Sequence, residues 1–449
     1  MTVAIVGGGI SGLSTAYYLA KAGISSTLIE ARPRLGGVIR TDHVQGCVVE
    51  AGPDSFLSVK PAAMDLIREL GLAGEVIGSN DHLRKTYVWK RGRMVPLPDG
   101  LMMMIPTRIL PMLASPLLSW PTKVRMGLEL LRGPATGTAE DRSVAEFVAA
   151  HYGDEAVDYL AEPLLSGIYG GNPDELSVRS VLPKFVELES KYGSLTRGVL
   201  AERREAATQP NHVPLFRTLK GGLGQLVDAL AAAIRESVTV KQGEAEAVER
   251  NGEGFRIRMG GDWLDADRVV LACEAHRAAK LVPDARIADL LETVPYGSSM
   301  TVAFGFARRD FPRPLDGFGF LVPKRERLRL VACTWVGTKF PHRVPEGQVL
   351  LRCFLIGTDE SDDAVSAAVL DELHAMLGFT ARPSFSRIFR WPRSMAQYPV
   401  GHQGRMAELS ERLKPIPGLH LAGNAYEGIG IPDCIRMGKQ AAQSISNLY

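Results

Sequence analysis

Three glycines and one glutamate near the start of the chain have the types and spacing of a nucleotide-binding site. Gly7, Gly9 and Gly12 form a GxGxxG pattern, and Glu30 follows about 20 residues later. In this pattern the first glycine permits a tight turn, the second lets the backbone approach a pyrophosphate, and the third allows close helix–strand packing. The carboxylate accepts hydrogen bonds from ribose hydroxyls and repels a 2′-phosphate. These residues predict a site for a dinucleotide that lacks a 2′-phosphate.

The elements that must position these residues can be recognised in the flanking sequence. Residues 3–6 are an apolar run typical of a buried parallel strand, residues 13–20 carry apolar positions at helical spacing, and residues 27–29 form a second strand. A strand, turn and helix in this order point the free amides of the helix start at the phosphates. Further cofactor contacts are therefore expected from Gly8, Ile10, Ser11 and Ala31.

A second glycine-rich stretch follows Glu30 and favours FAD over a nicotinamide cofactor. Arg34, Gly36 and Gly37 are similar to the second fingerprint of flavoproteins that resemble amine oxidases. An arginine near the pyrophosphate and another close backbone approach suit a larger, permanently held cofactor. The segment VVEAGPDSF, residues 48–56, is similar to a loop that passes beside the flavin in such proteins. Its expected cofactor contacts come from Gly52, Pro53, Asp54 and Ser55.

The other half of the predicted FAD domain lies far along the chain. Residues 267–273 read as a buried strand after an antiparallel excursion that includes Ala245, and residues 418–445 read as a strand, a glycine-rich turn and a helix. A helix beginning near residue 431 would aim its positive end at the N1/O2 edge of the flavin, where reduction places negative charge. Cofactor contacts are expected here from Ala245, Trp391, Gly423, Gly430, Ile431 and Pro432.

Composition narrows the class of protein. The chain has 449 residues, 45% hydrophobic and 23% charged, which predicts a folded protein of two or three domains. A formal net charge of +2 argues against a nucleic-acid binder. Five scattered cysteines without a CxxC pair predict reduced thiols in a cytosolic protein, and we expect no signal peptide. The apolar segment 101–120 has a proline at every fifth residue and is not expected to span a membrane.

Several longer motifs carry a resemblance to a known family. They are GGGISGL, EARPRLGG, EAGPDSFL, EPLLSGIYGGNPDELSVRS, TLKGGLGQLVDAL, DGFGFLVP, QYPVGH and EGIGIPDC. Together they cover nearly the whole chain, which resembles the FAD-dependent protoporphyrinogen/coproporphyrinogen oxidase family. SGIYGGNPDELS and GIGIPDC look specific to that family, and the first two motifs are shared with its flavoprotein relatives. GPDSF followed by Lys60, with MIPTRI, ACTW and FPHRVPEG, is most similar to the coproporphyrinogen III oxidases of Gram-positive bacteria.

Two positions depart from the pattern of relatives. Asp54 stands where the eukaryotic protoporphyrinogen enzymes commonly carry an arginine, and Cys273-Glu274 stand where relatives often have a small residue and proline. The first departure weakens any transfer of properties from the eukaryotic enzymes to this chain. The second predicts a shifted loop after the strand that ends at Cys273.

The resemblance implies an α/β fold, α+β overall, with the architecture of amine-oxidase-like flavoproteins. Residues 1–60, 210–290 and 390–449 would form a discontinuous Rossmann-like FAD domain. Residues 61–209 would form a mainly helical domain, and residues 291–389 an antiparallel sheet that roofs the substrate cavity.

The activity implied is six-electron oxidation of a porphyrinogen in haem biosynthesis, with O2 as acceptor and H2O2 as product. The favoured reaction converts coproporphyrinogen III to coproporphyrin III. FAD takes the hydrides and aromaticity provides the driving force, so no catalytic side chain and no metal is assigned. The substrate is a flat apolar ring with anionic propionates, for which Lys60, Arg179 and Tyr169 are the candidates, with Arg84 and Lys85 as weaker ones.

Other interpretations stay open at this point. The substrate could be protoporphyrinogen IX, or the protein could be a flavin amine oxidase or carotenoid desaturase, or a porphyrin carrier without catalysis. Segment 101–120 is either a contact with a membrane surface or buried core and cleft wall. The expected location is cytoplasmic, either free or peripheral on the inner face of the plasma membrane. Partners are the porphyrinogen and O2, with other haem-pathway enzymes as a further alternative.

Overall fold

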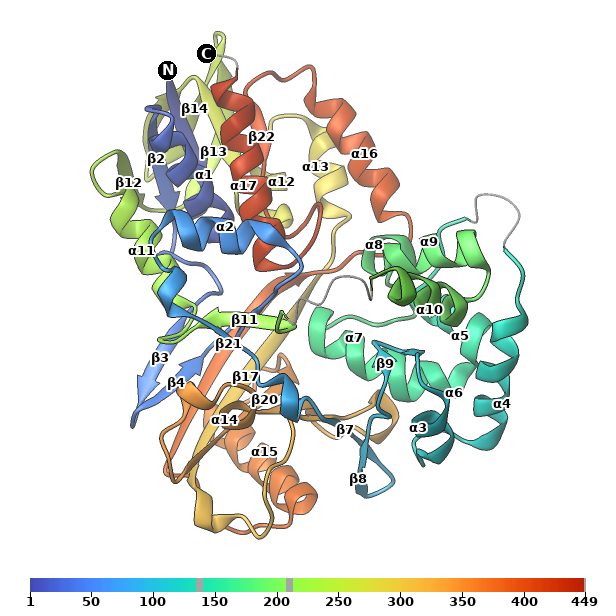
Figure 1. Cartoon of the computed structure of the whole chain (residues 1–449). Coiled ribbons are helices and arrows are strands. Elements are labelled where there is room, and N and C mark those ends of the chain that lie inside the picture. The colour runs from blue at the N-terminus through green and yellow to red at the C-terminus, as the bar shows by residue number, and fades with distance from the viewer. Residues whose placement is uncertain (135–139, 207–212, 448–449) are drawn as a thin grey trace.

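The computed structural model describes residues 1–134, 140–206 and 213–447. Its elements form three groups (Figure 1): a parallel sheet with its helices beside both chain ends, a long twisted sheet at the opposite end, and a set of helices from the middle of the chain. The functional site lies where the three groups meet.

The parallel sheet has the order β12-β2-β1-β16-β22, and all four pairings are parallel. It draws strands from the beginning, middle and end of the chain, so the domain is discontinuous in sequence. The strands are β1 (Thr2–Val6), β2 (Ser25–Glu30), β12 (Val238–Gln242), β16 (Arg268–Leu271) and β22 (Leu419–Leu421).

Alternating side chains of the buried strands cover both faces of this sheet. Val3 and Ile5 belong to one core cluster with helices α1 (Ile10–Lys21), α11 (Gly224–Ile234) and α17 (Ile431–Ser446). Ala4 and Val6 belong to the cluster on the other face, which includes residues of the antiparallel sheet β13 (Ala245–Asn251), β14 (Gly254–Met259) and β15 (Asp262–Ala266). A Cβ on Gly438 would lie 2.4 Å from the Ser11 carbonyl oxygen, so α1 and α17 pack with backbones close together.

The second large sheet has seven strands in the order β21-β17-β20-β19-β18-β7-β8. Its pairings are antiparallel except that between β18 and β7. Helix α15 (Asp362–Leu377) packs on one face through the cluster that contains Val365, Val369 and Leu373. The strands are β7 (Thr86–Lys90), β8 (Arg93–Pro96), β17 (Tyr296–Ala307), β18 (Gly319–Leu321), β19 (Leu330–Trp335), β20 (Gln348–Ile356) and β21 (Phe385–Ala396).

The middle of the chain is rich in helices. They include α3 (Ile109–Ala114), α4 (Trp120–Leu128), α5 (Val144–Tyr152), α7 (Glu162–Tyr169), α8 (Val178–Val181), α9 (Pro183–Tyr192) and α10 (Leu195–Ala206). Two parts of segment 61–209 pack elsewhere. Strands β7 and β8 complete the seven-stranded sheet, and α2 (Pro61–Glu69) contributes to the core beside α1 and α17.

Segment 101–120 folds into short pieces, as its regularly spaced prolines require. It contains β9 (Leu101–Met102), β10 (Ile105–Pro106) and α3, and its side chains divide between the core and the surface. Met104 and Met112 are buried, whereas Ile109 is 68% and Leu110 78% exposed. Within the described ranges, no helix combines the length and apolar character needed to cross a membrane.

Candidate functional site: a cavity between the two sheets

The turn between β1 and α1 has the geometry that its glycines predict. Gly7 has φ of +109°, and a Cβ on Gly12 would lie 1.9 Å from the Gly7 carbonyl oxygen, so neither position accepts a side chain. A Cβ on Gly9 would meet no atom of the described chain within 4 Å, because that side of Gly9 faces the cavity. Helix α1 has no side-chain cap at Gly9, which leaves its first amides available for a phosphate.

Glu30 lies at the end of β2, beside this turn. Its Oε2 accepts a hydrogen bond from the Gly8 amide at 2.7 Å, and its Oε1 accepts one from the Arg32 amide at 2.8 Å. These bonds fix the carboxylate at the wall of the cavity, and each oxygen keeps a lone pair for a ribose hydroxyl. Ala245, at the start of β13, also lines this end of the cavity.

The second glycine-rich stretch lies against the first. Gly36 donates its amide to the Gly8 carbonyl oxygen at 2.8 Å, and Gly36 and Gly37 both line the cavity. Arg34 does not line it. The Arg34 guanidinium donates to the carbonyl oxygens of Leu35 at 3.1 Å and Ile39 at 3.0 Å, and to that of Gly37, so it holds the turn from behind. Burial lowers the pKa of Arg34 from its usual value.

The loop after β4 (Cys47–Glu50) lines the cavity through Gly52, Pro53, Asp54 and Ser55. Within the described part of the chain, the amides of Gly52, Asp54 and Ser55 donate to no protein acceptor. Amides without a protein partner are free to donate, which makes this loop a donor surface for a ligand. That surface fits the predicted contact with a flavin.

The start of α17 closes the same end of the cavity. Gly430 is its N-cap, and Gly423, Gly430, Ile431 and Pro432 line the cavity, as predicted for contacts to the flavin. Asp433 Oδ2 accepts hydrogen bonds from the Gly430 amide at 3.3 Å and from Lys60 Nζ at 2.6 Å. The Lys60 side chain is 45% exposed, so this substrate candidate reaches the cavity while paired with the helix start.

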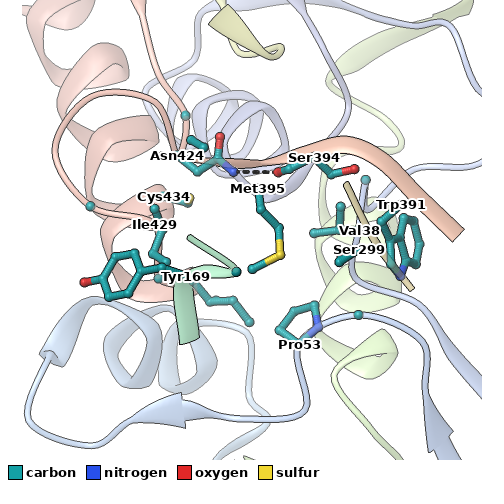
Figure 2. A pocket seen from close by; sticks show the side chains of 18 of the residues that line it. Val38, Pro53, Tyr169, Ser299, Trp391, Ser394, Met395, Asn424, Ile429 and Cys434 are labelled. Atoms are coloured by element: carbon teal, nitrogen blue, oxygen red, sulfur yellow. Dashed lines mark hydrogen bonds between the residues drawn. The ribbon is translucent and has the colours of Figure 1, made fainter. Parts of the chain in front are cut away.

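The cavity has a volume of about 2160 Å³. Ligand pockets are usually about 300–1,000 Å³, so this cavity can hold a dinucleotide and a second large molecule. Figure 2 shows that Tyr169, Met395 and Ile429 face the same space from different elements, with Pro53 and Trp391 on the other side. Burial raises the pKa of Tyr169 to about 12, so its hydroxyl stays neutral.

Several predicted residues lie outside the cavity wall. Gly8 and Gly12 lie behind the turn between β1 and α1. Arg34 lies behind the second glycine-rich stretch. The weaker substrate candidates Arg84 and Lys85 do not line the cavity, and Lys85 pairs with Asp316 at 3.0 Å. Arg179, in α8, does line it. Other cavity-lining cations were not singled out by sequence; they are Arg32, Arg277, Lys280, Lys324, Arg327, Lys339, Arg352 and Arg393.

Two aromatic residues of the QYPVGH motif position the C-terminal loop. Tyr398 Oη donates to the Asn424 carbonyl oxygen at 2.7 Å and accepts from the Gly428 amide at 2.8 Å. The ring of His402 stacks on Tyr398 with centroids 4.1 Å apart, and its Nε2 lies 3.2 Å from the Tyr426 carbonyl oxygen. Burial lowers the pKa of His402 to about 4, so the imidazole is neutral at pH 7. This role was not predicted, because the sequence indicates proximity to the flavin segment but not the contacts.

The nucleotide cradle, the unpaired amides and the size of the cavity all suit FAD. The family model of flavin containing amine oxidoreductases matches residues 10–446. The chain belongs to this family. As a member, it is a flavin-dependent oxidoreductase with FAD as its cofactor, as the sequence predicts. The α/β flavoprotein fold is confirmed as well.

Several relatives within the family are similar to this chain over nearly its full length. The chain is 35% identical to coproporphyrinogen III oxidase of Bacillus subtilis, over 98% of this chain and 96% of that one. It is 31% identical to the enzyme of the same name from Staphylococcus aureus, over 99% and 98% of the two chains. A crystal structure of a protein from Exiguobacterium sp. has a TM-score of 0.88 at 33% identity, covering 100% of this chain and 99% of that one. The resemblance inferred from sequence motifs is therefore confirmed.

More distant solved structures share the fold alone. Putrescine oxidase bound to putrescine has a TM-score of 0.71 at 21% identity, covering 99% of each chain. At that identity the likeness says nothing about the substrate of this protein.

Proposed function

We propose that this protein oxidises coproporphyrinogen III to coproporphyrin III, with three O2 reduced to three H2O2. The observation that carries the proposal is the full-length similarity to coproporphyrinogen III oxidases, at 35%, 31% and 33% identity over at least 98% of this chain. Bound FAD supplies the hydride-accepting ring, and three two-electron rounds account for the six electrons that the macrocycle loses.

The residues of this chain bind and orient the macrocycle. Tyr169, Met395 and Ile429 offer apolar and aromatic surface, which suits a flat ring and excludes water from it. Lys60 and Arg179 line the same cavity and would pair with propionates. The reacting carbons are flanked by electron-rich pyrrole nitrogens, so the chemistry requires no side-chain acid or base, and we assign none.

The loop between β18 and β19 adds two more cations to the cavity wall. Lys324 and Arg327 both line it, and Arg327 forms an ion pair with Glu162 of α7 at 2.7 Å. Coproporphyrinogen carries four propionates and protoporphyrinogen two, so a wall with many cations favours the former. Protoporphyrinogen IX is the second candidate, because bovine protoporphyrinogen oxidase is 29% identical over 99% of this chain.

The experiment that tests the proposal is aerobic turnover of freshly reduced coproporphyrinogen III and protoporphyrinogen IX in parallel. Porphyrin fluorescence and H2O2 are followed with and without protein, which subtracts autoxidation. We expect faster turnover of coproporphyrinogen III and one H2O2 for each two electrons. Equal or faster turnover of protoporphyrinogen IX would contradict the assignment of coproporphyrinogen III as the substrate. If FAD-loaded protein oxidises neither compound, both substrate assignments are excluded.

We further propose a cytoplasmic location with peripheral contact to the inner membrane face, through the apolar surface of α3 and α4. Ile109, Leu110, Trp120, Val124 and Leu128 are each more than half exposed there. Exposed apolar patches of this kind mark interaction surfaces. Co-sedimentation with anionic lipid vesicles tests the contact; it should fall at least fivefold in I109S/L110S and persist in L328S, which alters an exposed leucine elsewhere. Binding that survives in I109S/L110S would leave this surface for another protein, such as a haem-pathway enzyme.

A further inference from the structure

Three carbonyl groups of the loop after β4 are bound by side chains. Arg352 Nε donates to the Glu50 carbonyl oxygen at 2.8 Å, and Arg352 Nη2 donates to that of Gly52. Between them, Trp391 Nε1 donates to the Ala51 carbonyl oxygen at 2.8 Å. Three successive carbonyls are thus held by only two side chains.

Both of these side chains come from the seven-stranded sheet. Arg352 lies on β20 and Trp391 on β21, roughly three hundred residues from the loop in sequence. The Arg352 side chain is 4% exposed, and a guanidinium has a fixed planar fork of donors, so its hydrogen bonds define one orientation of the loop. The geometry of the FAD loop is therefore set by the other sheet.

The same contact carries a buried excess of positive charge. Asp54 accepts hydrogen bonds from Lys339 Nζ at 2.9 Å and lies 3.9 Å from Arg352. Glu50 pairs with Arg343 at 2.8 Å. Three cations thus face two carboxylates. Burial raises the pKa of Glu50, whereas Lys339 and Arg352 hold the pKa of Asp54 well below its usual range.

The residues that carry the unpaired amides of this loop line the cavity. With the carbonyls of residues 50–52 occupied, the loop still has the amides of Gly52, Asp54 and Ser55, which no acceptor in the described part of the chain uses. Held dipoles and buried positive charge stabilise an anion without reorganisation when the charge appears. A flavin gains negative charge when it is reduced, so this arrangement favours the reduced form.

We propose that Arg352 is a positioning residue for the flavin: by clamping the Glu50 and Gly52 carbonyls it fixes the amides of residues 52–55, and thereby raises the tendency of bound FAD to be reduced. The inference rests on FAD binding and is independent of which porphyrinogen is oxidised. It assigns to the substrate-side sheet a direct influence on the cofactor.

The test measures the flavin itself in holoprotein without substrate. R352M, R352K and W391F are purified with FAD, and each is reduced against a reference dye of known potential. In R352M we expect the ratio of reduced to oxidised flavin at a fixed dye potential to fall at least threefold. The flavin absorption bands should shift, and FAD should dissociate at least tenfold faster. R352K keeps the charge but not the fork and should lie between R352M and wild type.

W391F removes a single hydrogen bond, to the Ala51 carbonyl, and should shift the ratio in the same direction by a smaller factor. R390M is the matched control, since Arg390 lies on the same sheet and pairs with Asp362 at 2.6 Å, away from the loop; its ratio should equal that of wild type. Added ethylguanidine should restore part of the ratio in R352M. If R352M does not fold, R352K and W391F decide by the same ratio. Wild-type ratio and spectrum in the folded clamp variants would overturn the proposal.

Discussion

The two ends of the cavity are built in different ways. At the end proposed for the nucleotide, two short consecutive stretches line the cavity, around Gly9 and Gly36, with Glu30 between them. At the substrate end, the wall consists of side chains from distant elements, such as Tyr169 on α7 and Met395 on β21. Closely packed backbone leaves no space for an added Cβ, so a single substitution can abolish cofactor binding there. Where many side chains each contribute part of the binding free energy, single substitutions should have small effects.

Gly12→Ala should produce the largest effect. The added Cβ would lie 1.9 Å from the Gly7 carbonyl oxygen, so backbone must move against backbone. Overpacking usually costs about 1–3 kcal/mol, and this clash exceeds that range because no side chain can yield. We expect purified protein to retain less than a tenth of the FAD of wild type, measured by flavin absorbance after desalting.

The control for that change is Gly404→Ala. Gly404 lies in α16 (His402–Leu413), and a Cβ there would meet no atom of the described residues within 4 Å. Alanine is also the better helix former, so G404A should keep its FAD and unfold no earlier than wild type. Full FAD content in G12A would contradict the comparison between the two ends.

Lowering the pH should destabilise the C-terminal loop that Tyr398 and His402 hold. Burial holds the pKa of His402 at about 4, below its value of 6.5 in an unfolded chain. Between those values the unfolded state binds a proton that the folded state does not, so stability falls as pH drops from about 6.5 to about 4. The loss is at most about 3 kcal/mol. His402→Phe keeps an aromatic ring beside Tyr398, and its urea midpoint should fall less steeply over that window.

The control for this pH series is a substitution of a histidine that does not contact the C-terminal loop. His82 is exposed, so His82→Gln should reproduce the wild-type slope. A slope in H402F as steep as that of wild type would mean that other groups, not His402, govern stability in this window.

Lys60→Ala probes the substrate end, where we expect a modest change. The side chain is 45% exposed, so solvent screens its charge, and Arg179 and other cations line the same cavity. The KM for coproporphyrinogen III should rise about threefold to tenfold with little change in kcat, equivalent to about 1 kcal/mol. Lys184→Ala removes an exposed lysine outside the cavity and should behave as wild type. A fall in kcat alone would mean that Lys60 acts through Asp433 and α17.

The smallest effect is expected for Cys434→Ala. This thiol is buried at the start of α17, and burial raises its pKa to about 12, so it is a poor nucleophile toward a flavin. Acid precipitation of wild type should release all FAD into the supernatant, and C434A should bind as much FAD as wild type. Flavin that stays with the precipitate of wild type but not of C434A would reveal a covalent link.

The sequence predicted the local geometry of the glycine-rich turn because that geometry depends on neighbouring residues. A GxGxxG turn needs only its own neighbours, and the predicted α/β flavoprotein fold is confirmed. Arg34 shows the limit: its type and position indicated a contact with phosphate, but its guanidinium reaches the carbonyls of residues 35, 37 and 39. Which way a long side chain turns depends on acceptors that only the folded loop creates.

The substrate end was less predictable because its members meet only through tertiary contacts. Tyr169, Lys324 and Met395 lie in unrelated stretches of sequence, and no spacing rule joins them. Strands β7 and β8 likewise lie in a segment predicted to be mainly helical, yet they complete the seven-stranded sheet. The alternation of apolar and polar residues in β7 and β8 extends over only a few residues. The strand that pairs with β7 in the sheet, β18, follows more than two hundred residues later.

The order of strands in the parallel sheet has a consequence for biosynthesis. The edge of β16 stays open until β22 pairs with it, and α1 lacks its partner until α17 is made. Residues up to the end of α17 must therefore be synthesised before the dinucleotide cradle is complete, so we expect FAD to load after α17 is made and not while β1 and α1 emerge. A ligand that binds only the folded state stabilises it, so flavin supply should limit the yield of folded protein in cells short of riboflavin.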